Sequence, residues 1–464
     1  QLFFGLRRRR PARRGVPMKH REPSTKLGLE SIYYSHLGAS SMAEFKFIAR
    51  ALRHRNYRLF FGGQGVSLVG TWMQQVALSW LVYRLTNSAL LLGLVGFAGQ
   101  LPTFLLTSFA GVFADRWHRL RLLIVIQTLA AIQASILALL TLTGHIAVWH
   151  IFVLGICMGA ITAFDVPTRQ SLIGDLLDKR EDLGNAIALN SLMFNGARLV
   201  GPAMAGLILS VTSEGVCFLL NALSFTAVIG ALAAMRIPHL TRRPSQQRIL
   251  QGLKEGYAYG FGFPPIRYIL INLALLSLMG MPYTVLMPIF AKDILGGGPH
   301  TLGFLVAVAG VGALLSALYL ASRKSVVGLG TVIAVASGIF GCSLIFFSFS
   351  RYLPFSLLMS LCAGLGFMGV ITSTNTILQT ISHEDKRGRV MSLYAMAFMG
   401  MTPFGSLIIG ALANRMGAPS AVMVGGIVCV ISSCLFSSRL PTIRKLIRPI
   451  YVEKGILRPP PAVA

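Results

Sequence analysis

The chain has 464 residues, of which 54% are hydrophobic and only 12% carry a charge, and its mean hydropathy is +0.68. Soluble globular domains are about 45–50% apolar and about 25% charged, so this composition excludes a soluble protein and predicts a membrane protein. The formal net charge of +27 would suit nucleic-acid binding only if the basic residues formed one patch.

Residues 1–41 include the arginine run Arg7–Arg10 and have no apolar stretch long enough for a signal peptide. We predict that this segment is a disordered basic N-terminal tail, which could bind lipid headgroups. The alternative is that the segment is a mis-assigned start and that the chain begins at Met42.

Twelve apolar runs follow, each long enough for a helix to cross the about 30 Å hydrocarbon core of a bilayer. The predicted spans are residues 59–83, 88–112, 121–142, 147–165, 186–211, 216–236, 268–290, 300–321, 325–349, 354–379, 391–413 and 419–438. The predicted fold is therefore an all-α membrane protein with twelve transmembrane helices. We divide it into a six-helix half at 42–236, a cytoplasmic linker with an interfacial helix at 237–267, a second half at 268–440 and a cytoplasmic tail at 441–464.

Lys and Arg are distributed unevenly between the two ends of these spans. Outside residues 1–41, the loops on one side, together with both termini, carry 28 of them, and the loops on the other side carry four. Because positively charged loops stay in the cytoplasm, we predict cytoplasmic termini and a multi-pass protein of the cell (inner) membrane. The charge therefore reports topology, and we predict no nucleic-acid partner.

The first span carries a stripe of polar residues at helical spacing, which consists of Gln64, Ser67, Thr71, Gln74 and Gln75. In a bilayer such a stripe must face protein or water. One interpretation is hydrogen bonding between helices, and the other is the wall of a central cavity. On the second interpretation we predict that Gln64, Thr71, Gln74 and Gln75 contact a substrate.

The fifth span contains Asn195 and Arg198, which complete the predicted substrate site. A cation near the bilayer centre costs about 2.5–3.5 kcal/mol on insertion scales, so it persists only with a partner or a role. We predict that Arg198 binds an anionic group. The alternative is a structural tie from Arg198 to Asn190, Asn195 or backbone carbonyls.

Two charged motifs border the spans. Gly111, Asp115, Arg116 and Arg119 form the pattern Gly-x-x-x-Asp-Arg-x-x-Arg between the second and third spans. Such charges cannot lie in hydrocarbon, so we place the motif at the cytoplasmic surface, with Asp115 just before the next helix, where it meets the positive end of the helix dipole.

The second motif, Asp165-x-Pro167-x-Arg169, is expected to end the fourth span and to begin a charged loop. Its charges are interpreted either as a solvated cap or as part of a gate.

The second half of the chain repeats the first. Ser67–Gly70 recurs as Ser277–Gly280 and Met158–Thr162 as Met368–Thr372, both at an offset of 210 residues. Three glycines recur at an offset of 204 residues, with Gly196, Gly201 and Gly206 matching Gly400, Gly405 and Gly410. Two six-helix halves in parallel topology, with a site between them, are therefore predicted.

The copies differ in charge. Asp165 corresponds to Asn375 and Arg198 to Thr402, so the charged residues that act in function are expected in the N-terminal half.

The sequence contains no motif that supports an enzymatic function. Gly364–Gly369 matches Gly-x-Gly-x-x-Gly, but it lies inside a predicted span with no strand before it, which favours helix packing over a dinucleotide site. The chain has no nucleotide-binding P-loop, zinc-protease or serine-hydrolase motif. We predict that the protein is not an enzyme and needs no cofactor or metal.

These motifs resemble those of known transporters. The Gly111–Arg119 pattern resembles the loop between helices 2 and 3 of the major facilitator superfamily, and Gly196–Gly206 is similar to the glycine-proline motif of its antiporters, with Ala205 in place of one glycine. Four further segments are similar to the bacterial enterobactin-exporter and macrolide-efflux group: Phe164–Gln170, Asn185–Ser191, Phe218–Phe225 and Arg387–Ser392.

The resemblance implies a major facilitator fold and a proton-coupled antiporter that exports a siderophore or drug-like molecule by alternating access, as a monomer. It implies a gate formed by Gly111, Asp115, Arg116, Arg119, Asp165, Arg169, Gly201 and Pro202. Two departures matter: the fourth span lacks the arginine usual in drug antiporters, and no span midpoint contains Asp, Glu or His. The alternatives are a lipid or lysophospholipid flippase of the same fold and a non-transporting membrane scaffold or sensor.

Overall fold

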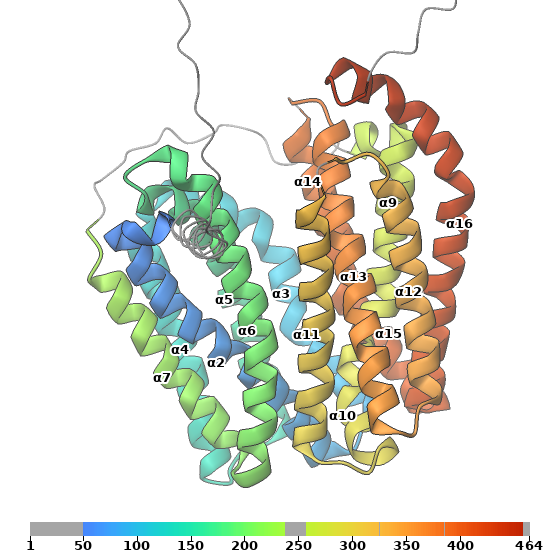
Figure 1. Cartoon of the computed structure of the whole chain (residues 1–464). Helices are drawn as coiled ribbons and strands as arrows, with labels where there is room; N and C mark the ends of the chain where they lie inside the picture. The colour runs from blue at the N-terminus through green and yellow to red at the C-terminus, as the bar shows by residue number, and fades with distance from the viewer. Residues whose placement is uncertain (1–49, 237–256, 324, 385, 458–464) are drawn as a thin grey trace, which may run out of the picture. The chain divides into compact units, whose positions relative to one another are not determined.

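The computed structural model describes residues 50–236, 257–323, 325–384 and 386–457; the predicted tail at 1–41 and most of the predicted linker lie outside these ranges. The first half contains α2 (Arg55–Thr86), α3 (Ala89–Arg116), α4 (Arg119–Leu142), α5 (Val148–Ile173), α6 (Leu183–Val211) and α7 (Glu214–Ala233), with short 3₁₀ turns η1 (Arg50–Arg53), η2 (Gly174–Leu176) and η3 (Arg180–Asp182). Figure 1 shows these helices in blue to green.

The second half begins with one long, irregular span made of α9 (Pro264–Leu275), η4 (Leu276–Gly280), η5 (Met281–Leu286), α10 (Met287–Ile289) and η6 (Phe290–Ile294). It continues with α11 (Pro299–Ser322), α12 (Leu329–Phe349), α13 (Leu353–Ile381), α14 (Arg387–Ala395), η7 (Met396–Gly400), α15 (Met401–Met416) and α16 (Ala418–Glu453). Figure 1 shows them in yellow to red.

The predicted all-α class and twelve spans are confirmed. Within the described residues, eleven helical segments are long and apolar enough to cross a membrane, and they correspond to the second to twelfth predicted spans. The first span is α2, whose 32 residues extend about 48 Å at 1.5 Å per residue. Its polar stripe makes it less apolar than the others. Large apolar side chains that face outward, such as Leu139 and Leu207, suit a lipid environment.

The two halves meet along α6 with α11 and along α3 with α15. A Cβ built on Gly303 would lie 2.7 Å from the Cα of Gly206, and one built on Gly93 would lie 2.9 Å from the Cα of Gly410. Glycine at these positions allows the two backbones to approach closely. The pairs are themselves copies, because Gly93 and Gly303 are 210 residues apart and Gly206 and Gly410 are 204 apart.

The Gly-x-Gly-x-x-Gly segment lies within α13. A Cβ on Gly364 would collide with the carbonyl of Ala309 on α11, and one on Gly366 would lie 2.7 Å from the backbone of Phe340 on α12. These glycines therefore serve close helix packing, as predicted.

Two helices differ from prediction near charged motifs. α5 does not end at Asp165 but continues through Pro167 to Ile173. A membrane helix tolerates proline because neighbouring groups satisfy the backbone atoms that it frees. Asp115 was expected to precede the third span directly, but α3 continues to Arg116, so the backbone of Asp115 belongs to the last turn of α3.

The last helix is longer than the predicted span at 419–438. α16 continues to Glu453 and includes Pro441 and Pro449. Its final turns bury Ile443 and Ile447, which are four residues apart and therefore lie on one face. The apolar face of this extension is therefore buried, and its polar face stays accessible to solvent.

Candidate functional site

A cavity of about 1510 Å³ lies between the two halves. Its wall is formed by α2 to α7 from the first half and by η5, α10, α11, α14, η7 and α15 from the second. A cavity of this size exceeds the about 300–1,000 Å³ that small-molecule sites occupy, so it can hold a large ligand with water.

One end of the bundle is closed by contacts between the halves. The hydroxyl of Tyr83, on α2, donates a hydrogen bond to the carboxylate of Asp293 in η6. Lys292 donates to the side-chain oxygen of Asn87 over 2.8 Å, and its ammonium lies 5.3 Å from the centre of the Tyr83 ring. The cavity extends from this end toward Asp165 of the first half and Arg389 of the second, which line its far part.

The polar stripe of α2 lies along the cavity wall, and its members differ in role. Gln64, Ser67, Thr71, Gln74 and Gln75 all line the cavity. Gln74 is buried and joins two other helices, because its amide donates to Gln133 over 3.3 Å and accepts from Asn221 over 2.8 Å. Gln75 is exposed. The two interpretations of the stripe therefore apply to different residues on it.

Arg198 lines the cavity from α6. Its guanidinium carbon lies 5.7 Å from the centre of the Trp72 ring, and Trp72 meets Phe194 edge to face at 5.9 Å. Within the described part of the chain, Arg198 makes no hydrogen bond or ion pair. The guanidinium is therefore held by an aromatic face, with its donors available to the cavity.

Asn195 lies outside the cavity wall in this structure, so its predicted substrate contact stays a prediction. Its amide donates to the backbone carbonyl of Ser191 over 2.9 Å, and the side chain is buried and away from the cavity wall. It is one turn from Arg198 on α6, but its amide bonds to the backbone of its own helix and not to the guanidinium.

Asp165 and Arg169 form an ion pair of 3.1 Å within α5, and their side chains are 15% and 14% exposed. Asp165 also accepts a hydrogen bond of 2.7 Å from the amide nitrogen of Gln127, on α4. Gln127 was not among the predicted site residues. A polar side chain inside the third span was the signal that could have identified it, because such residues in membrane helices face protein or water.

The other predicted gate residues lie in two places. Arg119 pairs with Asp175 over 2.9 Å and donates to the carbonyl of Ser171. Gly201 packs against Trp72, and the carbonyl of Pro202 faces Gly303 across the contact between the halves. Gly111, Asp115 and Arg116 belong to the segment 111–116, whose side chains lie outside the described structure.

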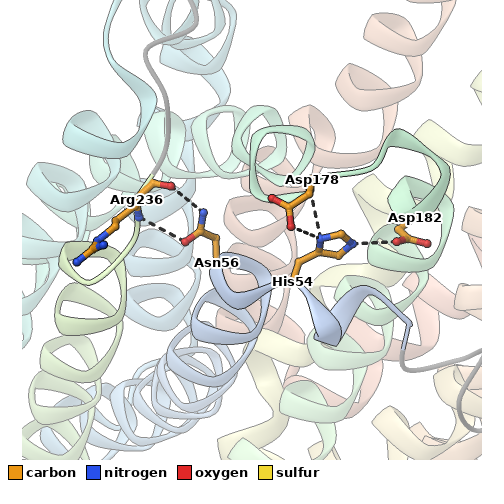
Figure 2. A network of polar contacts seen from close by, with 5 residues as sticks. All are labelled: His54, Asn56, Asp178, Asp182 and Arg236. Carbon is orange, nitrogen blue, oxygen red and sulfur yellow. Dashed lines mark hydrogen bonds and ion pairs between the residues drawn. The ribbon is translucent and has the colours of Figure 1, made fainter.

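A second charged cluster joins the start of α2 to the segment between α5 and α6 (Figure 2). The ring nitrogens of His54 lie 2.8 Å from the carboxylates of Asp178 and Asp182, and the buried Asp182 makes the larger contribution to raising the pKa of His54 above 6.5. Beside it, the side chain of Asn56 donates to the backbone carbonyl of Arg236 over 2.9 Å and accepts the backbone N–H of Arg236 over 3.3 Å.

Known proteins of similar sequence are membrane transporters. The chain is 26% identical to the staphyloferrin A transporter of Staphylococcus aureus, over 82% of this chain and 96% of that protein. It is 26% identical to the multidrug efflux pump Tap of Mycolicibacterium fortuitum, over 76% and 87%. It is 24% identical to the macrolide efflux protein A of Streptococcus pyogenes, over 82% and 96%.

Solved structures share the fold at low identity. A bacterial homologue of the human lysosomal transporter Spinster superposes with a TM-score of 0.63 at 14% identity, covering 88% of this chain and 99% of that one. A variant of the nucleoside transporter NupG gives a TM-score of 0.67 at 14% identity, over 84% and 99%. Residues 49–448 match the family model described as transmembrane secretion effector. The chain therefore belongs to that family, and its fold is that of the major facilitator superfamily.

Proposed function

We propose that this protein is a secondary active exporter that moves a siderophore or drug-like small molecule out of the cytoplasm, driven by the proton gradient. The observation that carries the proposal is the cavity of about 1510 Å³ between two repeated halves, closed at one end by Tyr83 and Asp293. The names of the relatives, which include siderophore, multidrug and macrolide transporters, support this substrate class.

The direction that the cavity faces follows from the distribution of charge. The closed end lies on the side whose loops carry four Lys and Arg, which the positive-inside rule assigns to the outside. The cavity reaches the opposite, positively charged side. On this proposal the structure represents the inward-facing state, and alternating access consists of opening the Tyr83 end while closing the Asp165 end.

Arg198, Trp72 and Phe194 favour a substrate with an anionic group next to a flat apolar part. The guanidinium can bind a carboxylate or phosphate through two parallel hydrogen bonds, and the rings offer a stacking surface. Arg198→Lys keeps the positive charge but loses the planar pair of N–H donors, whereas Arg198→Gln loses both the charge and the pair of donors.

The test uses purified protein in liposomes with staphyloferrin A and a radiolabelled macrolide as probes. Wild type should accumulate at least one probe against its gradient when a pH difference is imposed, and a fluorescent lipid should not change leaflet. Lipid movement without probe movement would establish the flippase alternative, and no movement of either would favour a scaffold. Both results contradict the proposal.

Arg198→Gln should weaken binding of staphyloferrin A, the anionic probe, by about tenfold or more, because a charge-assisted hydrogen bond contributes about 1.5–3 kcal/mol. Arg351→Gln is the matched control, since Arg351 is exposed and lies away from the cavity. Unchanged binding of the anionic probe to a well-folded Arg198→Gln protein would exclude Arg198 from the binding site.

A further inference from the structure

The cavity wall carries few groups that can bind a proton. Among the described residues that line it, Asp165 is the one carboxylate, and there is no histidine. Arg169, Arg198 and Arg389 line the same cavity, and arginine stays charged at any physiological pH. On the part of the wall that the structure describes, Asp165 is therefore the carboxylate that can accept a proton from this cavity.

The surroundings of Asp165 suit both of its protonation states. When ionised, it accepts the 2.7 Å hydrogen bond from Gln127 and pairs with Arg169. The side chain of Gln127 is only 3% exposed, and its amide oxygen is buried and accepts no hydrogen bond from the described residues. A buried acceptor that has no donor destabilises the state in which it occurs. The O–H of a protonated Asp165 would supply the missing donor.

The second half contains a neutral copy of this pair. At the offset of 210 residues, Asp165 and Arg169 correspond to Asn375 and Gln379. The copy keeps the contact between residues four apart, because the Gln379 amide donates to Asn375 over 2.6 Å. Helix packing at this position is therefore achieved without charge. The charge on α5 requires an explanation other than folding.

We propose that Asp165 is the proton-binding carboxylate that sets the balance between the inward-facing and outward-facing states, with Gln127 accepting the hydrogen bond of the neutral acid. The proton adds to one carboxylate oxygen, the ion pair with Arg169 is lost, and the same proton later leaves to the cytoplasm. The role of this proton in driving export rests on the proposed function.

The direction of the effect follows from charge. Closing this end of the cavity brings Arg169 of α5 nearer to Arg389 of α14, and like charges repel. An ionised Asp165 offsets that repulsion, so it favours closure, whereas the neutral acid favours the inward-facing state. Among the side chains that the structure describes, other charges near α5 are Arg198 on α6 and the pair of Arg119, on α4, with Asp175, in η2.

The experiment needs no substrate. Spin labels at the exposed positions of Lys179 and Glu384, in a background without native cysteines, report the width of this end in lipid nanodiscs over a series of pH values. The ratio of open to closed ends in wild type should rise as pH falls, by up to about tenfold per pH unit for one proton.

Asp165→Asn should remove this slope and hold the end open. Asp175→Asn is the matched control, because Asp175 is similarly buried, at 12%, and pairs with an arginine but does not line the cavity; it should keep the slope. His54 titrates at the same end, so the series is repeated with His54→Gln, which should also keep it. If Asp165→Asn does not fold, the double variant Asp165→Asn with Arg169→Gln reproduces the pair that the second half already contains.

An equal slope in wild type and Asp165→Asn, or a flat wild-type titration, would overturn the proposal. Proton-driven transport of the radiolabelled macrolide is measured separately in liposomes. Proton-driven transport with a flat titration would place the proton elsewhere and leave the proposed function intact. A slope lost only in Asp165→Asn, without proton-driven transport in wild type, would support the proton site and contradict the proposed function.

Discussion

His54 lies between two carboxylates, and its charge depends on pH. Hydrogen bonds to Asp182 and Asp178 raise its pKa above 6.5, and desolvation opposes them only in part. The protonated ring can donate to both carboxylates, whereas in the neutral ring Nδ1 can instead accept the backbone N–H of Asp178, 3.2 Å away. Because the pKa is raised on folding, the stabilisation is fully present below about pH 6.5 and is lost as pH rises through the raised pKa.

The first prediction concerns this cluster. The midpoint temperature of unfolding of wild type in nanodiscs should be higher at about pH 6 than at about pH 8.5, on the sign given by linkage. His54→Gln should lose most of this difference. Asn56→Ala removes the neutral pair with Arg236 at the same end, so it should lower the midpoint at both pH values and leave the difference unchanged. A pH difference that persists in His54→Gln would assign it to another group.

At the scale of one helix, α2 was predicted well in position and only partly in role. Its polar stripe indicated a face that avoids lipid, and all five residues of the stripe line the cavity between the halves. The sequence could not divide the stripe, because the partners of Gln74, which are Gln133 on α4 and Asn221 on α7, are distant in the chain. Similarly, Asp165 and Arg169 could be paired from their spacing, but Gln127 is 38 residues away.

The division within the stripe can be measured. Cysteine at Gln75 or Thr71 should react with a water-soluble maleimide, since both positions line the cavity and are at least partly exposed. Cysteine at Gln74 should react at least about tenfold more slowly, because Gln74 is buried among its hydrogen-bond partners, whereas Gln75 is exposed. Equal rates at Gln74 and Gln75 would show that the network is not closed.

The contact between α6 and α11 gives a third prediction. Gly303→Val would place its side chain against the carbonyl of Pro202 and the Cα of Gly206. Overpacking costs about 1–3 kcal/mol, so the inward-facing state should lose about fivefold to 150-fold in population. Gly230→Val is the control, because a Cβ there meets nothing within 4 Å. Spin-label distances across the cavity check the result, and equal distributions in the two variants would contradict it.

At the scale of the whole molecule, the internal repeat was readable from short matching segments, and so was the fold. The repeat did not reveal which copies touch. Gly93 on α3 contacts Gly410 on α15, which is the copy of α6. Gly303 on α11, which is the copy of α3, contacts Gly206 on α6. Such pairing depends on how the halves are placed about their approximate symmetry axis, which no local pattern in the chain encodes.

The contacts at the closed end give the last prediction. Tyr83→Phe removes the hydrogen bond to Asp293 while keeping the ring under Lys292. A hydrogen bond to a charged group contributes about 1.5–3 kcal/mol, so the outward-facing population should rise about tenfold or more. Tyr352→Phe, at an exposed tyrosine, is the control. Labels on the loops at this end should report the change, and an unchanged distance would show that the hydrogen bond from Tyr83 to Asp293 does not hold the end closed.

A single carboxylate on the described cavity wall also limits what such a pump can achieve. If Asp165 takes up one proton per cycle, a difference of one pH unit supplies about 1.4 kcal/mol and a potential of 100 mV about 2.3 kcal/mol. For an uncharged cargo the sum supports a concentration ratio of about 500, since each 1.4 kcal/mol is tenfold. For a monoanion, two charges move per cycle, so the potential counts twice and the ratio rises to about 25,000. The thermodynamic ceiling of this exporter would therefore depend on the charge of its cargo.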